Sequence, residues 1–239
     1  MPTSTLTAPA DPMLRKCALF EGADVDALDL ETVHAPRRTV VFHEGDPGDY
    51  LYVVLAGKVK LSRRAADGRE VVIALLGPSD HFGEVALLES CPRTATATVV
   101  TDAVLARLHK ADFDRWLTRS PQAAQQLLLV VARRIRGSRA TLNELLFADV
   151  SGRVAKQLIA LADQFGVVED DEIRVDHDLT QAELAQFVGA SRESVNRVLG
   201  TYTDRGWIRI EKMSIVILDP ERLAGRARPV WGRRGPHPQ

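Results

Sequence analysis

The spacing of apolar residues changes near residue 110, and this change separates two kinds of predicted structure. Before it, short runs rich in β-branched and aromatic residues are bounded by turn signals such as Ala56-Gly57, a pattern that predicts strands. Because no long helix separates these runs, they predict an antiparallel barrel or sandwich. The runs are Thr39 to Phe42, Leu51 to Leu55, Lys58 to Ser62, Glu70 to Leu75, Thr96 to Val100 and Val104 to Leu108.

After residue 110, the segment from Pro121 to Phe147 predicts one long helix, since Gly137 is its only glycine and no further proline interrupts it. Within it, residues recur at alternating spacings of three and four, and all but one are apolar. This heptad seam predicts a parallel two-helix dimer interface, with a helix packed on its own domain as the alternative. The seam consists of Leu128, Val131, Ile135, Ser138, Leu142 and Leu145.

The last third of the chain carries the signals of a helix-turn-helix. Asp149 or Ser151 can cap a helix that runs to Phe165, and an acidic loop follows from Gly166 to Asp171. The later signals are a capping box at Thr180 and Glu183 opening a helix to Val188, a turn at Gly189 to Ser191, a helix from Arg192 to Arg205, and a hairpin of Trp207 to Ile210 with Ile215 to Leu218. This order predicts a winged helix-turn-helix.

Composition excludes several classes. The formal net charge of −1 means that any nucleic-acid-binding face must be local, as in the cluster of Arg192, Arg197, Arg205, Arg209 and Lys212. Two cysteines and six histidines without ligand spacing predict no metal site, and no catalytic set stands out, so we predict no enzyme. No apolar run is long enough to span a membrane and no signal sequence is present, which predicts a cytoplasmic protein.

A first candidate site lies in the segment from Phe82 to Thr96. Gly83 allows close backbone approach to a ligand, and the helical turn that includes Val85 offers free N–H groups to an anion. Arg93 supplies a guanidinium that matches a phosphate, Glu84 accepts from a hydroxyl such as that of ribose, and Thr94 can donate one more hydrogen bond.

A second candidate site is the start of the predicted recognition helix. Arg192 and Arg197 can bind guanine, while Glu193 can accept from cytosine. The alternative is a solvated face with a Glu193–Arg197 ion pair. Three residues at the two helix starts are candidates for contacts to DNA, chiefly its phosphates: Thr180, Gln181 and Ser191.

Both sites resemble those of a known family. Phe-Gly-Glu, an apolar helix and Pro-Arg-x-Ala resemble the phosphate-binding cassette of cyclic-nucleotide-binding domains, and the run from Val188 to Arg197 is similar to the recognition region of the Crp/Fnr transcription regulators. Gly77 to Asp80, His177 to Gln181 and Arg205 to Arg209 resemble the cyclic-AMP receptor proteins of actinobacteria. A barrel without its ligand, a regulatory subunit of a kinase or transporter, and a nucleotide-processing enzyme are the competing interpretations.

The resemblance implies a cytoplasmic homodimer under allosteric control by cyclic AMP, with Glu84 on the ribose and Arg93 on the phosphate. By position, Arg134 and Ser138 match family residues that meet the ligand. Arg139 departs from the family pattern of a small polar residue, which leaves cyclic GMP, cyclic di-GMP or DNA binding without an effector as alternatives. The implied partners are a second copy of the chain, RNA polymerase, and double-stranded DNA with a palindrome of TGTGA-like half-sites.

The predicted fold class is therefore α+β, an antiparallel β-roll or jelly roll followed by a dimerisation helix and a winged helix-turn-helix. The predicted parts are a disordered leader (1–13), a cyclic-nucleotide-binding domain (14–119), the dimerisation helix (120–148), the DNA-binding domain (149–225) and a flexible basic tail (226–239).

Overall fold

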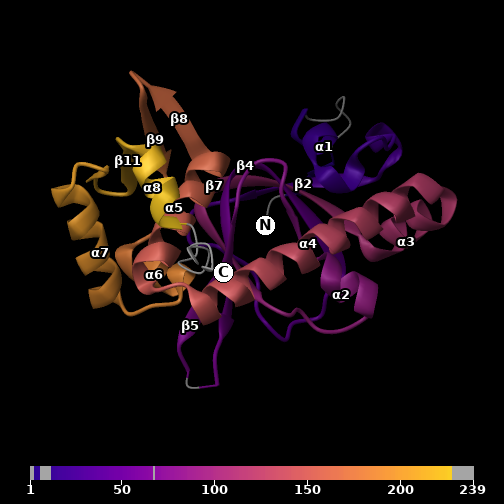
Figure 1. The fold of residues 1–239 in the computed structure, drawn as a ribbon. Helices are drawn as coiled ribbons and strands as arrows, with labels where there is room; N and C mark the ends of the chain where they lie inside the picture. The colour runs from indigo at the N-terminus through magenta and orange to yellow at the C-terminus, as the bar shows by residue number, and fades with distance from the viewer. Residues whose placement is uncertain (1–2, 6–11, 67, 228–239) are drawn as a thin grey trace, which may run out of the picture. The chain divides into compact units, whose positions relative to one another are not determined.

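The structure of the chain is a computed structural model that describes residues 3–5, 12–66 and 68–227. The chain divides into two compact units, residues 1–135 and 136–239 (Figure 1). The long helix α4 (Pro121–Phe147) spans this division and matches the helix predicted from the heptad seam.

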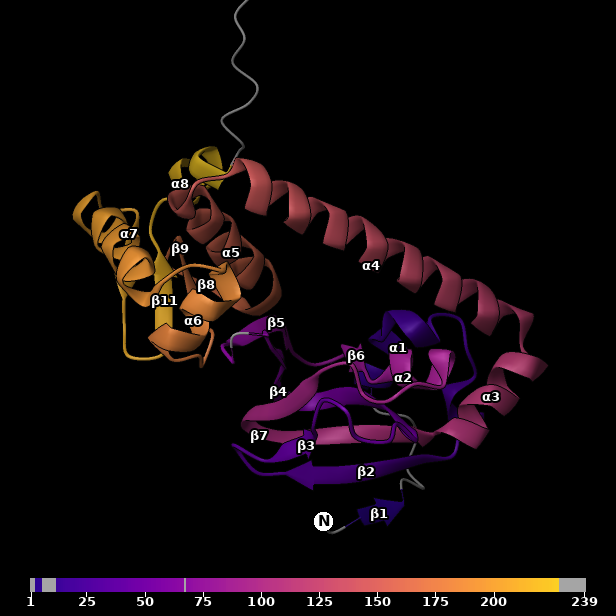
Figure 2. The same ribbon diagram turned by 90° about the horizontal axis from the view of Figure 1, so that it is seen from below.

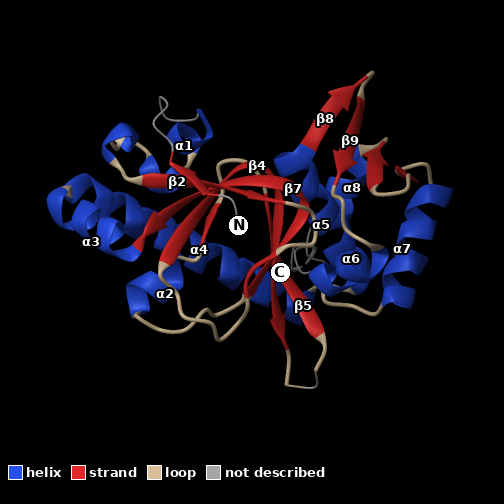
Figure 3. Ribbon diagram, turned by 180° about the vertical axis from the view of Figure 1, so that it is seen from behind, coloured by secondary structure: helices blue, strands red, loops and turns tan. Residues whose placement is uncertain are grey.

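The first unit is built on an antiparallel sheet, as predicted (Figure 3). Its strands are β1 (Thr3–Thr5), β2 (Leu30–Ala35), β3 (Val40–Phe42), β4 (Tyr50–Arg64), β5 (Glu70–Leu76), β6 (His81–Phe82) and β7 (Thr96–His109). The sheet order is β1-β2-β7-β4-β5, with β3 paired to β7 and β6 to β4. Its remaining helical elements are α1 (Pro12–Lys16), η1 (Ala18–Phe20), η2 (Val25–Ala27), α2 (Glu84–Glu89) and α3 (Lys110–Arg119). Figure 2 shows α1 and α2 on the same side of β4 and β7.

The turn predicted at Ala56-Gly57 is wrong, because β4 continues through it. Gly57 has a φ of 82°, and the register between β4 and β7 shifts on both sides of Ala56. A Cβ at Gly57 would lie 2.3 Å from the carbonyl oxygen of Asp102. The glycine therefore forms part of a β-bulge where two backbone segments approach closely. The runs predicted at 51–55 and 58–62 belong to one long strand, β4, and those at 96–100 and 104–108 belong to another, β7.

The N-terminal leader also differs in part from the prediction. Thr3–Thr5 form a strand that pairs antiparallel with residues 31–33 of β2, and α1 begins at Pro12. Backbone pairing along an edge strand places these three residues without any apolar pattern of their own. The other residues of the predicted leader, 1–2 and 6–11, lie outside the described residues.

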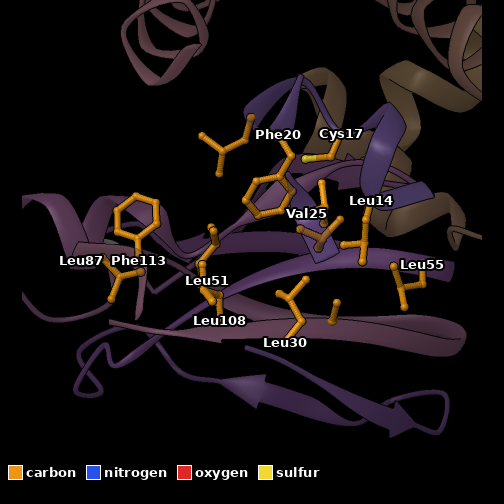
Figure 4. Close-up of a cluster of buried hydrophobic side chains, with 13 residues drawn as sticks. Leu14, Cys17, Phe20, Val25, Leu30, Leu51, Leu55, Leu87, Leu108 and Phe113 are labelled. Atoms are coloured by element: carbon orange, nitrogen blue, oxygen red, sulfur yellow. The ribbon is translucent and has the colours of Figure 1, made fainter. Parts of the chain in front are cut away.

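Two apolar clusters fill the first unit. One joins α1, η1 and α3 to the sheet, with Leu14, Phe20, Leu51, Leu108 and Phe113 among its buried side chains, and Leu127 of α4 packs against it (Figure 4). The other lies on residues of β3, β4, β6 and β7, where the rings of Tyr52 and Phe82 stack with centroids 5.1 Å apart. This second cluster carries the candidate ligand site.

The second unit has the predicted order of helices and hairpin. Its elements are α5 (Val150–Phe165), β8 (Gly166–Glu169), β9 (Glu172–Asp176), α6 (Gln181–Val188), α7 (Arg192–Asp204), β10 (Ile208–Ile210), β11 (Ser214–Ile217) and α8 (Pro220–Ala227). Its sheet has the order β10-β11-β9-β8. Buried Leu158, Leu184, Leu199 and Tyr202 form part of its core.

Two local predictions for this unit need correction, and one open alternative is resolved. The acidic loop predicted from 166 to 171 is β8 and its turn, because pairing with β9 closes a hairpin at Asp170 and Asp171, both with positive φ. Asp149, rather than Ser151, caps α5 by accepting from the backbone N–H of Gly152 at 2.8 Å. The predicted tail begins inside α8, which runs to Ala227, whereas residues 228–239 lie outside the described part.

Candidate functional site

The turn between β6 and α2 fixes the geometry of the first candidate site. Gly83 has a φ of 87°, and a Cβ built there would lie 2.7 Å from Nη1 of Arg93 and 3.1 Å from the carbonyl oxygen of Tyr50. A side chain would therefore meet both backbone strain and a collision. Gly83 was predicted to let a ligand approach the backbone closely. In the structure, the group that lies close to Gly83 is the guanidinium of Arg93.

Arg93 is 4% exposed and points into the first unit. Its Nη1 donates to the carbonyl of Gly83 at 2.9 Å, and Nη2 donates to the carbonyl of Tyr50 at 2.8 Å. The guanidinium carbon lies 4.2 Å from the ring centroid of Phe42, a cation–π contact. Burial lowers the pKa of Arg93, and its Nε has no hydrogen-bond partner among the described residues. One donor of a buried cation is left for a ligand.

Glu84 is the second buried charge, with 3% of its surface exposed. Its Oε1 forms an ion pair with Nη1 of Arg134, and Nη2 of Arg134 donates to the carbonyl of His81 at 3.1 Å. The other carboxylate oxygen, Oε2, is buried and accepts no hydrogen bond within the described part of the chain. Glu84 therefore binds α4 with one oxygen and leaves the other for a hydroxyl donor.

These groups line one cavity of about 260 Å³ in the first unit. Six of the predicted site residues line it: Gly83, Glu84, Val85, Arg93, Thr94 and Arg134. The cavity has a polar end at Glu84 and Arg93 and an apolar wall that includes Leu61 and Ile73. Such a combination of a few polar groups with an apolar wall is typical of a small-molecule site.

Ser138 and Arg139 are not among the residues that line this cavity. Both belong to the second unit, and both are exposed. Their contact with a ligand stays a prediction.

The sequence analysis missed the residues that the strands contribute to the cavity. Phe42, Leu61, Arg63 and Ile73 line it from β3, β4 and β5. Alternation along β4 puts Leu61 and Arg63 on one face and the buried Ser62 on the other. That alternation was the available signal, but it does not say which face of the strand meets a ligand.

The second candidate site is the first half of α7. Ser191 caps the helix by accepting from the backbone N–H of Ser194 at 3.2 Å. Val195, Leu199 and Tyr202 are buried, and the opposite face exposes the three predicted base-reading residues, Arg192, Glu193 and Arg197. The helix therefore presents these side chains to solvent as a recognition helix requires.

The i,i+4 ion pair considered for this helix does not form between the described side chains of Glu193 and Arg197. Hydrogen bonds from the residue's own backbone N–H and from the Ser191 hydroxyl lower the pKa of Glu193 instead. Arg197 consequently keeps its guanidinium available for a base.

The turn between α6 and α7 is fixed by contacts on both sides. Thr180 and Glu183 form both hydrogen bonds of the predicted capping box, while Gln181 is exposed beside them. Gly189 ends α6 with a φ of 70°. Arg153 of α5 donates to the carbonyls of residues 188 and 189, each at 3.2 Å. Arg153 is a positioning residue that sequence reasoning did not single out.

The hairpin contributes less free positive charge than its sequence suggests. Arg209 donates to Glu172 of β9 at 2.7 Å and lies 3.5 Å from Glu211, so carboxylates of its own sheet neutralise it. Arg174 is likewise paired with Glu211 at 2.6 Å. Among the described cations of the predicted basic cluster, Arg209 is therefore neutralised, whereas Arg192, Arg197 and Lys212 are exposed.

Two negative findings concern the described residues alone. Within them, no helix combines the length and apolar character that crossing a membrane requires. Among the same residues, His, Cys, Asp and Glu side chains form no cluster of three suited to a metal ion.

Comparisons with known proteins match both halves of the chain. The cyclic nucleotide-binding domain family matches residues 32–120, and the Crp-like helix-turn-helix domain family matches residues 152–226. A CRP-like cAMP-activated global transcriptional regulator of Mycobacterium tuberculosis is 47% identical over 223 residues, which cover 91% of this chain and 100% of the relative.

Two solved structures are similar in fold. A CRP/FNR-family transcriptional regulator from Thermus thermophilus has a TM-score of 0.69 at 27% identity, covering 82% of this chain and 97% of its own. The c-di-GMP responsive regulator CLP from Xanthomonas campestris has a TM-score of 0.66 at 26% identity, covering 78% of this chain and 92% of its own. The two similar proteins whose effectors are named thus respond to different nucleotides.

Proposed function

The chain belongs to the Crp/Fnr family of transcription regulators, and from this premise we propose that it is a homodimer whose affinity for DNA is set by cyclic AMP bound in the cavity of the first unit. Members of this family regulate transcription and are not enzymes, so the prediction that the chain is not an enzyme is confirmed. A cytoplasmic location, where the target DNA lies, is part of the proposal.

The observation that carries the proposal is that Glu84 and Arg93 line the same cavity and that each has one buried polar atom, Oε2 and Nε respectively, without a partner among the described residues. A buried polar atom without a partner costs about 1–3 kcal/mol, and more when the group is charged. A cyclic nucleotide supplies a 2′-hydroxyl that donates to Glu84 and a phosphate that accepts from Arg93. One ligand thereby satisfies both groups.

The same carboxylate supplies a route from ligand to helix. Glu84 already binds Arg134 of α4 with Oε1, so a hydroxyl on Oε2 changes the charge seen by that ion pair. Ligand binding then biases the position of α4 relative to the cassette, and the start of α5 at Asp149 passes the bias to the DNA-binding unit. This is coupling between two sites through one helix.

Dimerisation is supported by the seam of α4. In the single chain, Leu128 is 69% exposed, Ile135 51% and Leu142 59%. Apolar side chains at heptad spacing expose a stripe that a second α4 would cover. The exposed Ser138 interrupts the stripe at one seam position, where a polar residue can set the register.

The dimer presents two recognition helices, which fit half-sites about 34 Å apart in successive major grooves. Palindromic DNA with TGTGA-like half-sites is the proposed target, read by Arg192, Glu193 and Arg197. Thr180, Gln181 and Ser191 are the proposed phosphate contacts. RNA polymerase is the further partner proposed from family membership.

Calorimetric titration of the full-length protein with cyclic AMP, cyclic GMP and cyclic di-GMP tests the effector. We expect cyclic AMP to bind, and Glu84→Ala to weaken that binding about ten- to hundredfold through loss of a charge-assisted hydrogen bond. Arg119→Gln, on exposed α3 outside the cavity, is the matched control and keeps full affinity. Tight binding of cyclic di-GMP with none of cyclic AMP would replace the proposed effector by the alternative one.

DNA binding by the cyclic AMP complex tests the second half of the proposal. Arg192→Ala should cost about 1–3 kcal/mol on the TGTGA palindrome and leave binding to random DNA almost unchanged. Arg222→Ala removes an equally exposed guanidinium from α8 and serves as the control. An equal loss on both DNA sequences for Arg192→Ala would argue against base readout by that residue.

A further inference from the structure

Arg63 stands at the rim of the nucleotide cavity, at the end of β4. Leu61 and Arg63 share the face of β4 that lines the cavity, and Ile73 lines it from β5. Opposite them the register shifts, because Leu61 pairs with Ala74 and Ser62 with Val72, which leaves Ile73 as the extra residue of a β-bulge. A bulge re-aims side chains, and here it sets Ile73 beside Arg63 on an apolar wall.

A hydrogen bond to Glu44 positions the guanidinium of Arg63. Nε of Arg63 donates to Oε1 of Glu44 at 3.1 Å, while the backbone N–H of Arg64 donates to Oε2 at 3.3 Å. Glu44 is itself fixed, because its backbone N–H donates to Thr96 at 3.0 Å. The hydrogen bonds from Arg64 and Arg63 hold the pKa of Glu44 below its usual value. The carboxylate therefore stays charged and anchors the guanidinium through Nε alone.

This anchoring leaves both terminal nitrogens of Arg63 without a partner among the described residues, and the side chain is 59% exposed. The other two arginines of the cavity use their terminal nitrogens for contacts within the chain. Arg93 donates to the carbonyls of Gly83 and Tyr50, and Arg134 binds Glu84. Arg63 is thus the cavity cation with a free pair of N–H groups.

The polar end of the cavity accounts for the sugar and phosphate of a cyclic nucleotide, so the base must lie along the remaining wall of Leu61, Ile73 and Arg63. A purine offers the acceptor N7 on its outer edge, and guanine adds the acceptor O6 beside it. A guanidinium binds N7 and O6 together in a bidentate pair, whereas the C6 amino group of adenine is a donor and leaves only N7 to accept.

Resting on the proposed function, we infer that Arg63, positioned by Glu44, reads the N7 edge of the bound purine and determines base specificity in this cavity. Cyclic AMP receives one hydrogen bond from Arg63 and cyclic GMP receives two. The contact with Arg63 therefore favours purines over pyrimidines, and by itself it favours guanine over adenine by one hydrogen bond. Glu44 acts as a positioning residue, since it touches Arg63 and does not line the cavity.

The experiment is a calorimetric titration of the full-length protein and three variants with cyclic AMP, cyclic GMP, and 7-deaza cyclic AMP, in which carbon replaces N7. The variants are Arg63→Gln, Glu44→Gln and the control Arg64→Gln, whose side chain does not line the cavity. The comparison of cyclic AMP with its 7-deaza analogue is independent of any general loss of folding, because each protein is compared with itself.

We expect the wild type to bind 7-deaza cyclic AMP roughly tenfold more weakly than cyclic AMP. Arg63→Gln should reduce that ratio toward one and weaken cyclic GMP more than cyclic AMP. Glu44→Gln should have smaller effects in the same direction, both on the affinity ratio of cyclic AMP to its 7-deaza analogue and on that of cyclic GMP to cyclic AMP. Arg64→Gln should leave both affinity ratios unchanged.

Equal affinity of the wild type for cyclic AMP and its 7-deaza analogue overturns the inference while the proposed function stands. A loss in Arg63→Gln that is equal for all three ligands overturns it too, because it shows a structural role only. If the wild type binds no cyclic nucleotide, the inference and the proposed function fail together.

Discussion

At the scale of single residues, Gly83 is the position where the cassette tolerates least change. Its φ of 87° and the 2.7 Å separation between a built Cβ and Nη1 of Arg93 predict two separate penalties for Gly83→Ala. Left-handed backbone costs an alanine roughly 1–2 kcal/mol, and displacement of Arg93 should also weaken cyclic AMP binding by about tenfold or more. Urea unfolding measures the first penalty, and calorimetry measures the second.

Gly68→Ala separates the two penalties. Gly68 has a similar φ of 84°, but nothing lies within 4 Å of a built Cβ. We expect a comparable loss of unfolding free energy with unchanged nucleotide affinity. Unchanged affinity in Gly83→Ala as well would show that Arg93 does not need this close approach.

His81 makes the free energy of unfolding depend on pH. It is 8% exposed, and its Nδ1 lies 3.7 Å from the sulfur of Cys17. No described residue forms a hydrogen bond with its Nε2. Burial, with a smaller contribution from the charge of Arg134, lowers the pKa of His81 to about 4. The unfolded chain binds this proton near pH 6.5, so the stability due to neutral His81 is complete above that pH and is lost as the pH falls toward 4.

The shift predicts a loss of about 3 kcal/mol from this residue between pH 7 and pH 4. Urea unfolding of the wild type and His81→Leu over this range measures it, because titration of the carboxylates cancels in the difference. The wild type should lose stability more steeply on acidification. Parallel pH profiles for the two proteins would contradict a buried neutral imidazole.

At the scale of elements, α4 combines two functions on different faces. Ala123 and Val130 are buried, while four seam residues, Leu128, Ile135, Ser138 and Leu142, are exposed. We predict that Leu128→Lys converts the dimer to monomer, since a lysine ammonium cannot be buried unpaired in a helix pair. Sedimentation velocity over a range of concentrations measures the change.

Gln122→Lys places the same charge at an exposed position of α4 that faces away from the seam. It should remain as dimeric as the wild type. If both lysine variants, or neither, shift to monomer, the seam is not the interface. Calorimetry on the monomeric variant also shows whether nucleotide binding needs the partner.

At the scale of the whole molecule, the proposal requires that the two sites influence each other equally. If cyclic AMP raises DNA affinity by a given factor, the DNA palindrome must raise cyclic AMP affinity by the same factor, which we expect to lie between about 5 and 150. Fluorescence anisotropy with labelled DNA gives the first factor, and calorimetry with and without duplex gives the second. Two different factors would show that some linked state, such as the dimer, is changing between the measurements.

Charge also acts at this scale. The net charge of −1 forbids a generally basic surface, and the structure narrows the basic surface further, because Arg174 and Arg209 are paired with carboxylates of their own sheet. Among the described residues, Arg192 and Arg197 of the recognition helix are exposed and form no ion pair. The described part of this unit therefore offers a local rather than a global basic face to phosphates.

The sequence by itself determined those features that depend on residues close together in the chain. The capping box at Thr180, the Ser191 cap and the heptad seam are patterns within one or two helical turns, and their elements have the predicted bounds within a residue or two. Glu84 and Arg93 were identifiable because the cassette is a local string in which both charges stand close together.

Only the tertiary structure decided what depends on distant strands and helices. Gly57 serves a bulge rather than a turn because Asp102 lies against it, and the predicted loop after Gly166 is a strand and a tight turn because residues 166–169 pair with β9. The ion pair between Arg134 and Glu84 and the anchoring of Arg63 by Glu44 join residues far apart in the chain. Hydrogen bonds and ion pairs form wherever folding brings donors and acceptors together, and a one-dimensional pattern does not encode that proximity.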